Sequence, residues 1–196
     1  MKIEYFDGTR EDIAKMFAER GYTKGAEIGV AAGAYSLILC KSIPNLELYA
    51  VDCWAGLSLA NPGRAQIKAD KLHWRCHKAL RRYNAKMMKM WSHEAAPLFS
   101  DGYLDFVYID AGHDYKNVKQ DLELWVPKVR VGGIISGHDY VESIPFRAGR
   151  RIYYEVIPAV NEYVEAHNIE PLYLTKDLDE GSSRSWFCEK NEYQKL

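Results

Sequence analysis

The sequence predicts a single α/β domain, doubly wound, with a mostly parallel seven-stranded sheet and helices on both of its faces. Three observations lead to this prediction. Short runs rich in Val, Ile and Leu alternate with amphipathic segments over nearly the whole chain, as in strand–helix–strand units. Several of these runs are apolar at consecutive positions, which is typical of buried parallel strands. Near the C-terminus two strand-like runs flank a polar turn, so we expect an antiparallel hairpin strand there.

Composition is that of a globular chain from a reducing compartment. The 196 residues include 26 Lys and Arg and 27 Asp and Glu, and this balance gives the whole molecule no case for binding nucleic acid or a membrane surface. No apolar stretch approaches the ~20 residues of a membrane span, and the polar N-terminus does not resemble a signal peptide. The four cysteines are widely spaced, which argues against zinc and against a disulfide framework. We expect one cytoplasmic domain over residues 1–196.

The elements follow in order along the chain. Residues 1–22 are expected to be a helical N-terminal segment, because Thr9 and Asp12 form a capping pattern and Gly21 ends the helix. Further helices are expected at 32–43, 64–84, 93–99, 116–129 and 153–168. Strands are expected at 25–30, 46–52, 87–92, 104–110, 132–139, 171–175 and 183–190.

Four of the expected strands end in a polar side chain: Asp52, Ser92, Asp110 and Asp139. The carboxyl ends of parallel strands meet at one edge of a sheet, and ligands of open α/β sheets bind beyond that edge. A histidine lies close to two of these ends, His113 after Asp110 and His138 before Asp139. The sequence therefore predicts one functional site that both His/Asp pairs share.

The first strand–helix turn, "EIGVAAGAYS", indicates which ligand this edge holds. Gly29 and Gly33 allow a tight turn, but Ala31 stands where a dinucleotide-binding turn has its middle glycine. Glu27 would repel a phosphate and suits an amino group. Asp52, ending the next strand, can bind both hydroxyls of a ribose. A nucleoside with a cationic amino-acid tail, S-adenosylmethionine (SAM), satisfies all of these features.

The ordered series "EIGVAAG", "AVDCWAG" and residues 91–140 resembles the class I SAM-dependent methyltransferases, which have a Rossmann-like fold. The resemblance is nearest to the small O-methyltransferase branch, catechol O-methyltransferase-like and macrocin-O-methyltransferase-like. It implies the following cofactor-binding residues: Glu27, Gly29, Gly33, Asp52, Cys53, Ser92 and Asp110. The two glycines could instead serve only the turn, Asp52 could be a solvated strand end, and Ser92 could cap the helix that follows it.

The resemblance also implies a role for the two His/Asp pairs. Metal-dependent members bind Mg²⁺ through an acid at the position of Asp110 and an acidic or amide pair at the positions of His138 and Asp139. A histidine is a poor ligand for Mg²⁺, so a softer ion such as Mn²⁺, binding through the two acids with waters, or no metal at all stay open.

His113 stands three residues after Asp110, where the catechol-type enzymes have a lysine that acts as general base. A histidine can do the same work near neutral pH. We therefore predict His113 as the base, with Asp110 and Asp139 as orienting or metal-holding acids. The alternative is that His113 is a solvated residue at the start of a helix.

Two basic segments bear on the acceptor. Residues 64–89 contain nine Lys and Arg and one acid, with a stripe at helical spacing: Lys68, Lys71, Arg75, Lys78 and Arg82. This stripe is either a solvated outer face or a surface for an anionic ligand. "FRAGRR" (146–151) lies in a loop, 141–152, that we expect to act as a substrate lid. The expected partner is a small-molecule acceptor, anionic if these arginines bind it; the sequence leaves a homo-oligomer open.

Three alternatives remain. A nucleotide-dependent oxidoreductase is disfavoured by Ala31, and a non-catalytic SAM-binding protein would keep the same cofactor turn. An RNA methyltransferase could dock through the basic helix at 64–89. However, the fourth strand ends in "IDAGHDY", without the Asn/Asp-Pro-Pro-aromatic motif of base N-methylation, so nucleic acid is the less favoured acceptor and an oxygen acceptor is expected.

Overall fold

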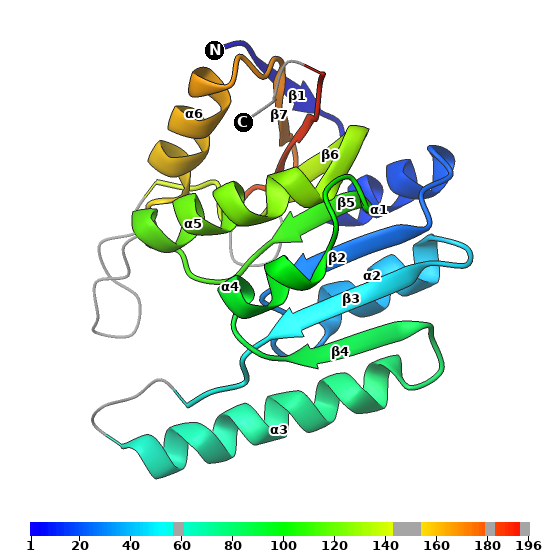
Figure 1. Cartoon of the computed structure of the whole chain (residues 1–196), viewed down its shortest axis with the longest axis vertical. Coiled ribbons are helices and arrows are strands. Elements are labelled where there is room, and N and C mark those ends of the chain that lie inside the picture. Colours follow the sequence, from blue (N-terminus) through cyan, green and yellow to red (C-terminus); the bar gives the residue numbers. More distant parts are fainter. Residues whose placement is uncertain (57–60, 143–153, 179–182, 193–196) are drawn as a thin grey trace.

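An eight-stranded sheet runs through the protein in the order β1-β7-β8-β6-β5-β2-β3-β4 (Figure 1). The structure is a computed structural model and describes residues 1–56, 61–142, 154–178 and 183–192. Neighbouring strands are parallel except where β8 pairs with β6 and β7, so the predicted doubly wound sheet with an antiparallel C-terminal hairpin is confirmed. The strands are β1 (Ile3–Phe6), β2 (Lys24–Ile28), β3 (Glu47–Asp52), β4 (Ala85–Lys89), β5 (Leu104–Ile109), β6 (Val129–Gly137), β7 (Leu172–Thr175) and β8 (Trp186–Glu189).

Helices cover both faces of the sheet (Figure 1). Helices α4, α5 and α6 pack on one face and α1, α2 and α3 on the other, each set over its own group of buried apolar side chains. None of the helices in the described part of the chain is long and apolar enough to cross a membrane. The helices are α1 (Arg10–Glu19), α2 (Ala34–Ser42), α3 (Pro62–Leu80), α4 (Ser92–Ala95), α5 (Tyr115–Trp125) and α6 (Val156–Ala166), with 3₁₀ turns η1 (Ala96–Leu98) and η2 (Val126–Lys128).

The central strands are almost wholly buried because helices cover them on both sides. β2 lies between β3 and β5, so that Ile28 is level with Val51 and Ile109 at the carboxyl ends. Gly25 has no side chain because the Phe106 ring occupies that space: a Cβ on Gly25 would lie 2.0 Å from the ring. This register sets the loops after β2, β3 and β5 at the same edge.

The N-terminal segment differs from the sequence prediction, which made residues 1–22 helical. Helix α1 forms, and its N-terminus carries the predicted capping box between Thr9 and Asp12. Before it, however, residues 3–6 form β1, an edge strand parallel to β7, and this gives the sheet eight strands rather than seven. Four residues of half-exposed edge strand do not produce a recognisable apolar run, which explains the omission.

A second difference concerns the strand predicted at 87–92. The strand β4 is earlier, and Ser92 is the first residue of α4 rather than the end of a strand. Trp91 occupies the N-cap position, so the alternative that Ser92 caps this helix is wrong. Most of the predicted lid, residues 143–152, together with "FRAGRR", lies outside the described residues.

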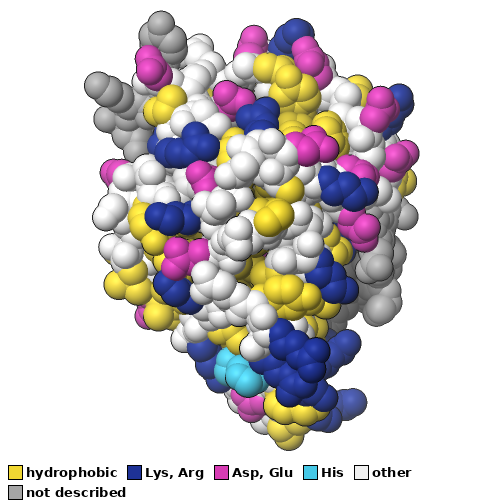
Figure 2. Space-filling model, turned by 90° about the vertical axis from the view of Figure 1, so that its right-hand side faces the viewer, with side chains coloured by type: hydrophobic (Ala, Val, Ile, Leu, Met, Phe, Trp, Pro, Cys, Tyr) yellow, Lys and Arg dark blue, Asp and Glu magenta, His cyan; other side chains and the backbone are white. Residues whose placement is uncertain are grey.

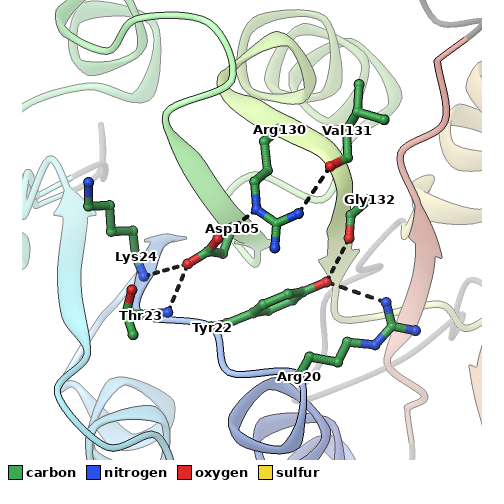
Figure 3. Close-up of polar contacts among 8 residues, drawn as sticks. All are labelled: Arg20, Tyr22, Thr23, Lys24, Asp105, Arg130, Val131 and Gly132. Atoms are coloured by element: carbon green, nitrogen blue, oxygen red, sulfur yellow. Dashed lines mark hydrogen bonds and ion pairs between the residues drawn. The ribbon is translucent and has the colours of Figure 1, made fainter.

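At the edge of the sheet opposite the strand carboxyl ends, one aspartate connects three segments (Figure 3). Oδ2 of Asp105 accepts hydrogen bonds from the backbone N–H groups of Thr23 and Lys24, at 2.8 and 2.9 Å. Its Oδ1 accepts a bond from Nε of Arg130 at 2.8 Å. These contacts join the starts of β2, β5 and β6 at the end of the molecule away from the predicted site.

Candidate active site

A cavity of about 680 Å³ opens at the carboxyl ends of β2, β3 and β5. Its size is within the range of small-molecule sites. It gathers residues from the turn after β2, the ends of β3 and β5, the starts of α1, α2 and α4, and from α5. The predicted site residues among its lining are Glu27, Gly29, Asp52, Cys53, Ser92, Asp110 and His113. Asp139, His138 and Gly33 are not part of the lining.

The turn after β2 lies against the end of β5. The N–H of Asp110 donates to the carbonyl of Ile28 at 2.7 Å, and Gly29 has φ 91°. A Cβ on Gly29 would stand 2.1 Å from the carbonyl oxygen of Asp110, so only glycine fits at this crossing. Gly33 has a different role: it starts α2 with φ 79°, and a Cβ there would lie 3.0 Å from Sγ of Cys76 on α3.

Glu27 is a buried acid at the floor of the cavity, with 2% of its surface exposed. The hydroxyl of Ser36, the third residue of α2, donates a hydrogen bond to it. Burial raises the pKa of Glu27 to about 8, although the Ser36 bond acts in the opposite direction. A cation placed beside this carboxyl would favour its ionised form and offset the cost of burial.

Asp52 holds the loops around the cavity together. Its Oδ2 accepts hydrogen bonds from the N–H groups of Val30 and Ala31, at 3.0 and 2.8 Å. Its Oδ1 accepts one from the N–H of Trp54 at 2.7 Å, and the indole of Trp54 donates to the carbonyl of Ala31 at 2.8 Å. Asp52 is therefore a structural acceptor for the turn. Its Oδ2 already accepts two bonds, and its Oδ1, which accepts one, keeps a lone pair for a further donor.

Ser92 is held from α5 rather than from its own helix. Its hydroxyl donates to Asp121 and accepts a bond of 2.8 Å from Nε1 of Trp125. Burial raises the pKa of Asp121 to about 6. Asp121 also lines the cavity, so this part of the lining has an acid directly beside Ser92.

The two His/Asp pairs meet, as the sequence predicts for strands that end at a common edge. Nδ1 of His113 lies 3.4 Å from Oδ2 of Asp139. Nδ1 of His138 lies 3.2 Å from Oδ1 of Asp139 and 4.0 Å from Oδ2 of Asp110. Asp139 has φ 53°, a left-handed backbone that is uncommon outside glycine. The fold thus holds Asp139 between two imidazoles.

The surroundings shift the pKa values of Asp110 and Asp139 in opposite directions. Burial raises the pKa of Asp110 to about 6, although the charge of His138 acts against the shift. Burial acts in the same direction on Asp139, but the hydrogen bond from His138 and the charges of both histidines outweigh it and lower the pKa of Asp139. An ionised Asp139 can therefore stabilise a proton on either neighbouring imidazole.

The residues that could hold a metal ion differ from the predicted set. Asp110, His113 and Asp139 each offer one ligand atom, and these atoms lie within 4.8 Å of one another. His138 was predicted in place of His113. Its Nε2 lies 3.3 Å from the hydroxyl of Ser183, on the side away from this group.

Sequence reasoning missed several lining residues, among them Arg10, Tyr35 and Asp121. Arg10 is the first residue of α1 and lies outside every motif, whereas Asp121 lies within α5, inside the segment 91–140 that carries the resemblance. The one available signal was at Tyr35 and Ser36, which follow directly on the glycine turn.

Four of the five cations of the predicted basic stripe lie on α3, and the fifth, Arg82, follows the end of the helix; all five are exposed. Figure 2 shows Lys and Arg side chains gathered, with a histidine and hydrophobic side chains among them, at the end of the molecule that α3 occupies. Trp74 is 60% exposed there, with Nζ of Lys78 lying 4.5 Å from its ring centroid. The stripe cations do not line the cavity.

One curated relative combines weak identity with a large difference in length. The uncharacterized protein y4gI of Sinorhizobium fredii is 23% identical to this chain over 164 residues. The match covers 79% of the chain but 17% of that protein. The chain therefore spans about one sixth of the length of this relative, and the similarity assigns no activity.

Solved methyltransferase structures share the fold. The O-methyltransferase from Bacillus cereus, determined in complex with SAH, superposes with a TM-score of 0.58 at 16% identity, over 92% of this chain and 80% of its own. The N-methyltransferase NodS from Bradyrhizobium japonicum gives 0.61 at 14% identity, over 93% and 95%. Since one acts on oxygen and the other on nitrogen, the shared fold does not select the acceptor atom.

The family assignment rests on the sequence itself. Residues 26–140, more than half of the chain, match the model of a methyltransferase domain family. This segment contains the turn after β2, the end of β3 and both His/Asp pairs, so it includes most of the cavity described above. The chain therefore belongs to this methyltransferase domain family.

Proposed function

We propose that residues 1–196 act as one methyltransferase domain that transfers the methyl group of SAM to a hydroxyl group of a small molecule. The observation that carries the proposal is a shared cavity. His113, which pairs with Asp139 outside the lining, lines the same cavity as Glu27 and Asp52, the two acids suited to an amino group and a ribose. One cavity then has a place for the cofactor and a base for the acceptor.

At the cofactor end, Glu27 would bind the amino group of the methionine tail, and Asp52 the ribose hydroxyls. Cys53 and Ser92 also line the cavity, on the side where the adenine would lie. Gly29 lets the backbone approach the ligand closely. Gly33, which packs on Cys76, would act by shaping the turn rather than by contact.

At the acceptor end, His113 would take the proton of the attacking hydroxyl. Since Asp139 faces Nδ1, a proton on Nδ1 is favoured and Nε2 is left as the basic nitrogen. SAM would supply the methyl group to the attacking oxygen and would leave as SAH, and Nε2 of His113 would take up the proton that the hydroxyl loses. Methyl transfer is an in-line displacement, so positioning of the two ligands supplies much of the effect.

An oxygen acceptor is supported by the sequence after β5. Residues 109–115 read "IDAGHDY" and contain no proline, whereas base N-methylation motifs carry Pro-Pro at this point. The basic stripe on α3 faces away from the cavity, so it gives no support to an anionic small-molecule acceptor.

A divalent ion is the second candidate occupant of the acceptor end. The group Asp110, His113 and Asp139 combines one imidazole with two carboxylates, which suits Mn²⁺ or a later transition ion and does not suit Mg²⁺. When bound, such an ion would supply Lewis-acid polarisation of the acceptor oxygen. His113 would then be a ligand and could not serve as the base, so the two roles exclude one another.

The first experiment is calorimetric titration of the purified chain with SAM, followed by turnover with hydroxylated small molecules after dialysis against a chelator. We expect micromolar binding, and turnover that survives chelation and falls in His113→Ala across pH 6–9. Absence of SAM binding would remove the proposal. Turnover that is lost on chelation and restored by Mn²⁺ would mean that a metal ion, and not His113 acting as base, activates the acceptor.

A further inference from the structure

The methionine tail of SAM carries a carboxylate as well as an amino group. The cofactor residues assigned so far provide an acid, Glu27, for the amino group and no partner for the carboxylate. Burying an unpaired carboxylate is costly, so a site for the whole tail needs a positive or strongly donating group nearby. Among the described residues that line the cavity, Arg10 is the one Lys or Arg.

The position of Arg10 is fixed by its surroundings. It is the first residue of α1 and lies within the capping box, between Thr9 and Asp12, in which the N–H of Thr9 donates to Asp12 at 3.0 Å. The hydroxyl of Tyr35 donates to the backbone carbonyl of Arg10 at 3.1 Å. The guanidinium carbon lies 5.4 Å from the ring centroid of Tyr35, so backbone and side chain are both held against α2.

This contact brings Arg10 to the methionine end of the cavity. Tyr35 is 3% exposed and stands next to Ser36, whose hydroxyl holds Glu27. The charge of Arg10 acts to lower the pKa of Glu27 and of Asp110, against the dominant effect of burial. The guanidinium of Arg10 is therefore close enough to interact electrostatically with Glu27, the acid that would bind the amino group.

We propose that Arg10 binds the carboxylate of the methionine tail while Glu27 binds its amino group, so that the pair recognises the zwitterion. This inference rests on the proposed cofactor. A guanidinium presents paired N–H donors that match a carboxylate, and its charge strengthens both bonds. Arg10 precedes the residues that match the family model, which begin at residue 26.

The test compares two ligands that differ only in the tail. S-Adenosylhomocysteine (SAH) has the zwitterion, and 5′-methylthioadenosine has the same nucleoside thioether without it. Calorimetry would measure both dissociation constants for the wild-type chain, Arg10→Met and Arg10→Lys. Arg20→Met is the matched control: Arg20 lies at the other end of α1 and pairs with Glu189.

We expect Arg10→Met to weaken SAH by roughly tenfold to a hundredfold and to leave methylthioadenosine within about twofold. Arg10→Lys should recover part of the loss, and Arg20→Met should change neither ligand. Equal SAH affinities in Arg10→Met and wild type would overturn this inference alone, as would an equal loss for both ligands. Binding of neither ligand by the folded wild-type chain would overturn the proposed cofactor, and this inference with it.

Discussion

Nδ1 of His113 lies 3.4 Å from Oδ2 of Asp139, across the gap between the loops that follow β5 and β6. The second oxygen of Asp139 faces His138, so one carboxylate serves two imidazoles. The left-handed backbone of Asp139 aims its side chain into this position. Strain of this kind persists where the surrounding structure holds it, which often happens at functional sites.

Replacing Asp139 by Asn should lower kcat on the order of a hundredfold if His113 is the base. An amide at this position can donate to Nδ1 and favour the other tautomer, which leaves no basic nitrogen for the acceptor. Asp139 does not line the cavity, so the SAH dissociation constant should stay within about twofold of wild type. Steady-state kinetics and SAH calorimetry on the same preparations would measure both quantities.

Asp101→Asn is the matched control, because Asp101 is an exposed acid that pairs with Lys128 at the opposite edge of the sheet. It should leave kcat unchanged. An Asp139→Asn enzyme with wild-type kcat would show that Asp139 has no part in positioning His113.

Glu27 predicts a pH dependence for cofactor binding. Burial raises its pKa to about 8, so most Glu27 side chains carry a proton at pH 7. The amino group of the ligand favours the ionised form and lowers this pKa, so binding should release a proton. The affinity for SAH should therefore rise from pH 6 to pH 8 and level off above.

Calorimetry in two buffers of different ionisation enthalpy would count the released protons. In Glu27→Gln the affinity should be lower and nearly independent of pH over this window, because the amide does not titrate. A wild-type affinity that is flat between pH 6 and pH 8, with no proton release, would contradict an ionisation of Glu27 on binding.

The sequence was sufficient to predict those features that depend on the position of a residue in its own strand. Apolar runs that alternate with amphipathic helical segments predicted a mostly parallel sheet. The acids at the strand ends predicted the position of the site, because the last residues of parallel strands lie at one edge of the sheet. The fold and the family are confirmed by the structure and by the family match over residues 26–140. The roles of the individual site residues stay predictions.

Sequence reasoning failed where the role depends on another segment. Ser92 is held by Asp121 on α5 and Arg10 by Tyr35 on α2, and no spacing along the chain encodes such contacts. Gly33 had the right turn conformation, but its close neighbour is Cys76 of α3 rather than the cavity. The strand β1 was missed because its four half-exposed residues form no recognisable apolar run, and only its pairing with β7 makes it a strand.

Asp52→Ala should abolish SAM binding and also destabilise the protein by about 1–3 kcal/mol. The reason is that Asp52 accepts backbone hydrogen bonds from Val30, Ala31 and Trp54, so the substitution also releases the cofactor turn. Loss of binding in this variant alone does not identify a ribose contact. Urea unfolding would measure the stability change.

A change in the ligand tests the ribose contact without disturbing the turn. The wild-type chain should bind the 2′-deoxy form of methylthioadenosine roughly tenfold more weakly than methylthioadenosine itself, since one hydrogen bond to a charged acceptor is lost. Equal affinities would mean that Asp52 makes no hydrogen bond to the ribose 2′-hydroxyl, and its structural role in the turn would be unaffected.

Asp105 provides a prediction about stability that is independent of the active site (Figure 3). Burial acts to raise its pKa, but the N–H groups of Thr23 and Lys24 and the charge of Arg130 outweigh it and lower the pKa below the usual value. A carboxylate whose folded pKa is depressed contributes stability above its unfolded pKa and loses it as the pH falls through the folded value.

Asp105→Asn should therefore lower the free energy of unfolding by about 1–3 kcal/mol at pH 7, because the amide cannot pair with Arg130 or accept both backbone bonds as strongly. The difference from wild type should shrink as the pH falls below about 4, where the wild-type carboxylate takes up its proton. Urea unfolding from pH 7 to pH 3 would measure it, with Asp101→Asn as an exposed control at the same edge. The SAH dissociation constant at pH 7 should not change, since Asp105 stands at the far end of the strands from the cavity. A loss of stability that is the same at pH 3 and at pH 7 would mean that the carboxylate charge is not what joins β2, β5 and β6.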